Sequence, residues 1–299
     1  MDLPATPAAP APGAPTTATP LSERAQARRE TLRVLLRRPA FIIGNVVMIG
    51  WIITAVLGER ITPYDPFNAF DVGHLPPGPD HLMGTDRLGR DVFSRVMVGS
   101  RDVLIVAPLA AILGVVAGTL LGLVMGYYRG IVDDVLSRLV EAFLALPVIL
   151  VALLTLVVLG TSAPVVVGVV GILFTPIVAR TVRSAVLSER QLDYVTAAKL
   201  RGESGLFILS REIFPNVLGP TVVELTVRFG YAIFTVATLS FLGVGIQPPS
   251  ADWGLTVSDE YTNMIAGVWW PTLFPALAIA SSVVAVNLIA DSLQSVLSE

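Results

Sequence analysis

The stretch DYVTAAKLRGESGLFILSREIFPN, residues 193–216, separates two strongly apolar segments and is itself charged and rich in small residues. Its pattern predicts a helix, a bend and a second helix. Asp193 can cap the first helix, and Gly202 fits a left-handed position at its end. Ser204 can cap the second helix, which Pro215 is expected to end. Both pieces are shorter than the roughly 12–15 residues at which an isolated helix becomes marginally stable in water, so packing must hold them.

The composition of the whole chain is that of a membrane protein. Of its 299 residues, 54% are hydrophobic and 14% are charged, and the mean hydropathy is +0.73. Soluble domains carry about 25% charged residues. The chain has no cysteine, which excludes disulfides, thiol nucleophiles and cysteine-ligated metals. We expect the lipid bilayer as a partner and no nucleic acid.

Six segments are apolar and long enough to cross a bilayer, which takes roughly 20 residues. They are Phe41–Leu57, Val103–Met125, Ala142–Leu159, Ala163–Ala179, about Leu218–Leu242, and Trp270 to about Ile289. We expect the third to extend through Arg138 and Glu141 at its cytoplasmic end, with a kink at Pro147. The sequence therefore predicts an all-α, multi-pass integral membrane protein with six transmembrane helices.

The arginines before the first span predict the orientation. Six of them lie in residues 21–39, and positive charge beside a span favours the cytoplasmic side. Six crossings then place both the N and C termini in the cytoplasm, together with the quoted loop. The loop at 58–101 falls outside, although it also contains five arginines.

We divide the chain into three parts. Residues 1–39 form a disordered Pro/Ala-rich tail and a basic cytoplasmic lead-in. Residues 40–102 hold the first transmembrane helix and an external loop. Residues 103–299 form a five-helix core that contains the cytoplasmic loop 188–216.

Small side chains in the quoted stretch indicate a docking surface. Ala197 and Ala198, expected side by side on the surface, would let another surface approach the backbone closely. An apolar stripe beside Arg201 and Arg211 suits recognition of a helix in a groove. From the residues alone, an amphipathic connector lying on lipid headgroups explains the pattern equally well.

The spacing T-A-A-x3-G-x9-E-I-F-P-N resembles the E-A-A-x3-G-x9-I-x-L-P loop of permease subunits in bacterial ATP-binding-cassette importers. Thr196, Glu212 and Phe214 stand where Glu, Ile and Leu are usual. In that family the loop is the coupling helix, which sits in a cleft of the ATPase subunit. The resemblance implies that the loop binds the ATPase through Asp193, Tyr194, Ala197, Ala198, Arg201, Gly202, Ser204, Ile213, Pro215 and Asn216.

Two further motifs narrow the resemblance. HLMGTDRLGRDVFSRVMVGSR, residues 81–101, and LSFLGVGIQPPSADWG, residues 239–254, are similar to segments of the dipeptide, oligopeptide and nickel permeases of the second-permease type. This implies a type I importer permease fold in the bacterial cytoplasmic (inner) membrane, translocating short peptides. Departures from the family pattern stand at Val236, Ala290, Ser292 and Gln294.

The resemblance also implies a set of partners. These are a second homologous permease, two cytoplasmic ATPase subunits and an extracytoplasmic substrate-binding protein. ATP and Mg²⁺ would be bound by the ATPase partners, and no cofactor or metal is expected in this chain. The sequence contains no G-x-x-x-x-G-K-[ST] motif, so it predicts a transport subunit and not an enzyme with its own ATPase site.

Some alternatives stay open at this point. Nickel or glutathione could be the cargo of the same machine. A secondary transporter driven by an ion gradient would need midplane acids in both halves of the chain, and we find only Glu224. Glu224 can pair with Arg228 four residues later, or both can line the translocation path. A membrane scaffold without transport activity is the third reading.

Overall fold

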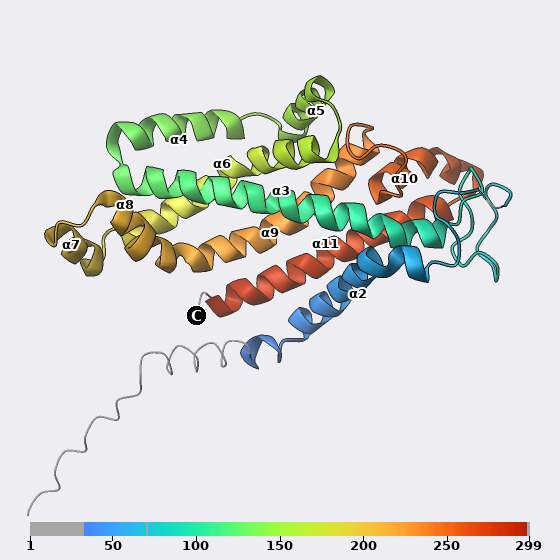
Figure 1. Ribbon diagram of the computed structural model, residues 1–299, viewed down its shortest axis with the longest axis horizontal. Coiled ribbons are helices and arrows are strands. Elements are labelled where there is room, and N and C mark those ends of the chain that lie inside the picture. Colours follow the sequence, from blue (N-terminus) through green and yellow to red (C-terminus); the bar gives the residue numbers. More distant parts are fainter. Residues whose placement is uncertain (1–32, 70, 298–299) are drawn as a thin grey trace, which may run out of the picture.

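The computed structural model describes residues 33–69 and 71–297, and the regular secondary structure of these residues is helical apart from an isolated bridge between Thr85 and Asp91 (Figure 1). Most of the predicted N-terminal tail lies outside the described residues. The helices are α2 Pro39–Ile61, α3 Val92–Tyr128, α4 Gly130–Leu144, α5 Val148–Leu159, α6 Ala163–Glu189, α7 Asp193–Leu200, α8 Gly205–Phe207, the π-helix η1 Ile208–Ile213, α9 Phe214–Phe241, α10 Trp253–Glu260, the 3₁₀ helix η2 Tyr261–Ala266, and α11 Trp270–Leu297.

In the described part of the chain, five continuous helical segments of 23 to 37 residues are long and apolar enough to cross a membrane, and α4 with α5 makes a sixth candidate. The all-helical membrane fold is therefore confirmed. The kink that we expected at Pro147 in the third span is present, and it is sharp enough to divide the span into two helices, α4 and α5, that meet at 87°. Pro147 accounts for the break, since it lacks an N–H group and disfavours helical backbone at Leu146.

A row of glycines holds α3 against α6. Gly114, Gly118, Gly122 and Gly126 recur every four residues on one face of α3. A Cβ atom added at Gly118 would lie only 2.6 Å from the Cβ of Val178. Small residues at this spacing let two membrane helices pack backbone to backbone. This contact forms the centre of the bundle, with α9 and α11 packed beside it (Figure 1).

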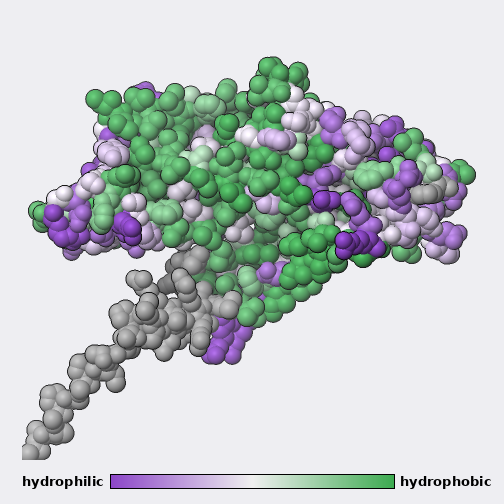
Figure 2. Space-filling model, viewed as in Figure 1, coloured by the Kyte–Doolittle hydropathy of each residue, from purple (hydrophilic) through white to green (hydrophobic). Residues whose placement is uncertain are grey.

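Hydrophobic surface covers the middle of the molecule, and hydrophilic residues gather at its two ends (Figure 2). One end carries α7 and α8. The other carries α10 and the segments 62–91 and 243–268 (Figure 1). This distribution is what a bilayer of about 30 Å requires of a protein that crosses it.

The segments 62–91 and 243–268 pack on each other and on the start of α3. Arg95 is buried, and its guanidinium donates to the carbonyl oxygens of Pro66 at 3.0 Å and Ser250 at 3.2 Å. The indole of Trp253 donates to the Val96 carbonyl at 2.8 Å, and that of Trp270 donates to the Thr85 carbonyl at 3.0 Å. The two motifs at 81–101 and 239–254 are therefore parts of one folded cap.

Candidate partner-binding loop between α6 and α9

The first helix of the loop begins at the residue that we expected to cap it. α7 starts at Asp193, and the cap position is Leu192, which offers no side-chain hydrogen bond. The expected capping role of Asp193 is therefore wrong. Its carboxylate lies instead in the first turn, where the partial positive charge of the helix N-terminus favours it.

The bend after α7 has the geometry that we predicted. Gly202 is left-handed, with φ of 77°. Its N–H donates to the Lys199 carbonyl at 3.0 Å, and the N–H of Glu203 donates to the Ala198 carbonyl at 3.2 Å. These two bonds form a Schellman motif. Ser204 then caps the next helix by accepting a hydrogen bond from the Phe207 N–H at 3.3 Å.

The second helix of the loop does not end at Pro215. It passes through η1 directly into α9, so that Gly205–Phe241 forms one continuous 37-residue span. Pro215 lies in the first turn of α9. Just before it, the Phe214 N–H donates to the Leu209 carbonyl, five residues back. The expectation failed because the wider π turn ends where α9 begins, and a first-turn proline needs no partner for the N–H that it lacks.

One side of the loop is buried against α6. Ala198 and Ile213 are fully buried and pack with Val195, Val182 and Val186. The expected pair of surface alanines is therefore wrong for Ala198, because successive residues of a helix point about 100° apart. Ala198 and Ile213 hold the loop in place and are not available to a partner.

Polar side chains tie α7 to its neighbours on both sides. The Tyr194 hydroxyl donates to Glu189 Oε2 at 2.6 Å and accepts from Asn216 Nδ2 at 3.1 Å. Burial, helped by this bond to Glu189, raises the pKa of Tyr194 to about 12. Arg201 pairs with Glu212 at 3.2 Å. Three of the predicted site residues, Tyr194, Arg201 and Asn216, therefore make contacts within the loop.

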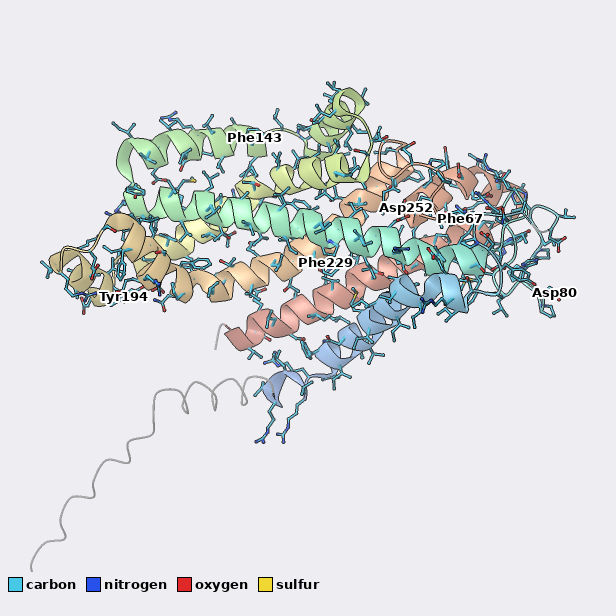
Figure 3. All side chains as sticks on the ribbon, in the orientation of Figure 1. Phe67, Asp80, Phe143, Tyr194, Phe229 and Asp252 are labelled. Carbon is cyan, nitrogen blue, oxygen red and sulfur yellow. The ribbon has the colours of Figure 1, made fainter. Side chains whose placement is uncertain are left out.

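The exposed face of the loop carries two bulky apolar side chains that our site prediction left out. Leu200 is 84% exposed and Leu206 is 74% exposed, one on each side of the Gly202 bend. Ala197 is also exposed, three residues before Leu200 and so on the same face of α7. That spacing was the signal in the sequence for Leu200. Figure 3 shows the labelled Tyr194 at this end of the molecule, and Phe67 and Asp80 at the opposite end.

Glu224 and Arg228 pair with each other in α9. Arg228 Nε lies 3.0 Å from Glu224 Oε2, and the Thr181 hydroxyl donates to Glu224 Oε1 at 2.8 Å. Glu224 borders a cavity of about 390 Å³ that Thr181, Val227 and Gln294 also line. The pairing that we predicted is present, and a role in lining the translocation path stays a prediction.

Residues 118–299, which include the whole loop and the Glu224 pair, match the family of binding-protein-dependent transport system inner membrane components. The chain belongs to this family. It is thus a multi-pass component of the inner membrane.

Several curated permeases are similar to this family member over most of its length. The putative peptide transport system permease protein of Brucella suis is 41% identical over 273 residues, which cover 89% of this chain and 90% of the relative. The dipeptide transport system permease protein of Bacillus subtilis is 33% identical, over 90% of this chain and 84% of the relative. The glutathione transport system permease protein of Pectobacterium atrosepticum is 36% identical, over 90% of each. The resemblance to permeases of peptide-family ATP-binding-cassette importers is therefore confirmed.

Proposed function

We propose that this permease moves short peptides into the cell as part of an ATP-driven importer. We further propose that the loop between α6 and α9 binds the ATPase subunits and transmits their motion to the membrane helices. The observation that carries the proposal is the exposed apolar face at Leu200 and Leu206, presented by a bend that buried residues hold in place. Burial of these exposed apolar groups by a partner would be favourable, because it removes apolar surface from water. The names of the similar permeases support a peptide cargo.

The loop can transmit motion because it is continuous with a membrane span. From Gly205 the helix runs through η1 and α9 to Phe241, next to the cap that contains α10. Tyr194 links α7 to Glu189 at the end of α6 and to Asn216 at the start of α9. A displacement of the loop would therefore move α6 and α9 together.

The partners that we propose are a second homologous permease, two ATPase subunits bound at the loop, and an extracytoplasmic substrate-binding protein. The ATPase subunits supply the ATP site, because this sequence has no phosphate-binding P-loop. In this arrangement the loop and both termini face the cytoplasm, and the cap formed by segments 62–91 and 243–268 faces the substrate-binding protein.

Glutathione is the second candidate cargo. The permease of Pectobacterium atrosepticum, 36% identical to this chain, is named for glutathione transport. Glutathione is itself a small peptide, so a translocation path for glutathione and one for other short peptides would need similar lining residues.

Substitution of the two exposed leucines tests the docking role. The Leu200→Asn/Leu206→Asn double variant should lose most of its co-purification with the ATPase subunits, because each buried leucine contributes about 1.5–3 kcal/mol. We expect a loss of at least about tenfold in ATPase affinity, with unchanged thermal stability of the permease.

The control is Ile265→Asn, which changes a 96% exposed side chain in η2 at the opposite end of the molecule. It should leave ATPase binding unchanged. Full retention of the ATPase by the double leucine variant would show that the loop is not the docking surface.

A further inference from the structure

A groove of about 570 Å³ lies between α2 and α3, near the C-terminal end of α2. The two helices approach closely at Gly58, where an added Cβ atom would lie 3.3 Å from Val98 Cγ2. The groove is open to the surroundings, and most apolar side chains along α2 are exposed. In Figure 2, α2 forms a hydrophobic band that ends in a hydrophilic patch.

Polarity changes along the groove in the direction of the helix axes. The part of the groove farther from the cap is lined by Ile52 and Val56 of α2 and Ile105 of α3, which are 49%, 75% and 49% exposed. Arg60 and Arg101 line the end that lies nearest the cap. Because α2 and α3 are membrane spans, this gradient runs from hydrocarbon to headgroup depth.

The charged end of the groove carries a net positive charge. Arg101 Nη1 lies 3.0 Å from Glu59 Oε1, so this pair is neutral, and both side chains are more than half exposed. Arg60 has no ion-pair partner among residues 33–69 and 71–297. A guanidinium has five N–H donors, so Arg101 keeps donors free for a second acceptor.

We propose that this groove binds an anionic phospholipid. The phosphate would accept hydrogen bonds from Arg60 and Arg101, and an acyl chain would lie along Ile52, Val56 and Ile105. Arginine and phosphate form strong charge-assisted hydrogen bonds, and the aliphatic side chains match the acyl chain at the correct depth.

A protein segment is a poorer occupant of the same groove. A protein that covered the groove would take Arg60 out of water, and an unpaired buried charge is costly. A lipid phosphate neutralises Arg60 and stays at the water boundary. The proposal therefore commits to lipid.

Native mass spectrometry of the delipidated full-length chain tests the site. The chain is titrated with phosphatidylglycerol and with phosphatidylcholine of the same acyl composition. We expect phosphatidylglycerol to bind about tenfold more tightly. The Arg60→Gln/Arg101→Gln variant should lose this preference, and Val56→Trp, which fills the groove at an exposed position, should weaken the binding of both lipids.

Arg87→Gln is the matched control, since it removes an exposed guanidinium from the same end of the molecule without touching the groove. It should keep the preference. Equal binding of the two lipids by the wild type, or an unchanged preference in the double arginine variant, would overturn the proposal. Because the chain has no cysteine, Val56→Cys also reports on the occupant in native membranes. Its cross-linking to another protein would overturn the proposal too.

Discussion

At the scale of single residues, Gly202 determines the direction of the loop. Its φ of 77° strains any residue with a β-branched side chain, while no heavy atom lies within 4 Å of the position that an added Cβ atom would take. A substitution there therefore acts through the backbone and not through a clash. Gly202→Val should cost on the order of 1–2 kcal/mol at this bend and turn α7 away from α8.

We expect Gly202→Val to lower substrate-stimulated ATP hydrolysis and peptide uptake while the protein still inserts in the membrane. Gly202→Asn is the control, because asparagine tolerates the left-handed conformation. Both activities are measured on the assembled transporter in proteoliposomes. Wild-type coupling in the valine variant would contradict the role of the bend.

Asp252 gives the cap a dependence on pH. Its carboxylate is fully buried and caps α10 by accepting from the Leu255 N–H at 2.9 Å. Burial raises the pKa of Asp252 from 3.8 to about 6, because it penalises the charged form. The folded state thus favours the protonated acid. Its contribution to stability is complete below about pH 3.8 and is lost as the pH rises through about 6.

Asp252→Asn should remove this contribution to the pH dependence while keeping the cap, since an amide oxygen can accept the same bond. Between about pH 4 and pH 7 the wild type should lose on the order of 2 kcal/mol of stability that the variant keeps. Thermal unfolding of both proteins in detergent across this range measures the difference. Parallel curves would mean that Asp252 is ionised throughout.

At the scale of elements, α4 is held to α6 by an ion pair. Arg183 donates to Asp133 through Nε at 2.6 Å and through Nη2 at 2.7 Å. The Asp133 side chain is 8% exposed, and Arg183 is 31% exposed. Asp133→Ala should cost about 1–3 kcal/mol and lower the Tm by a few degrees, because it leaves a partly buried guanidinium unpaired. Asp134→Ala, at the exposed neighbouring position, should leave the Tm unchanged. An equal shift of the Tm in both variants would show that the ion pair does not hold α4 to α6.

The elements also show what the sequence could and could not predict. The spans follow from apolar length, and the Gly202 bend and Ser204 cap follow from local chemistry, so these were predictable. Proline can end one helix or begin the next, and only packing decides that Pro147 breaks a span while Pro215 does not. Likewise, eight residues of helix cannot show which of Ala197 and Ala198 is buried, because α6 supplies the covering surface.

The chain as a whole is a bundle with the α6–α9 loop at one end and a folded cap at the other. Glu224 is paired with Arg228, and no histidine lies in the spans among residues 33–69 and 71–297, so the bundle offers no convincing proton relay. This agrees with our proposal that the energy for transport comes from ATPase partners. We propose that these partners bind the loop at its exposed Leu200 and Leu206.

Uptake of labelled di- to pentapeptides, with and without an uncoupler at a held ATP level, tests this account most directly. The cells compared are a strain that lacks this permease and the same strain carrying it. We predict that uptake requires the permease and survives collapse of the proton gradient. Loss of uptake with the uncoupler alone, while ATP is unchanged, would contradict the claim that ATP hydrolysis drives transport through this chain.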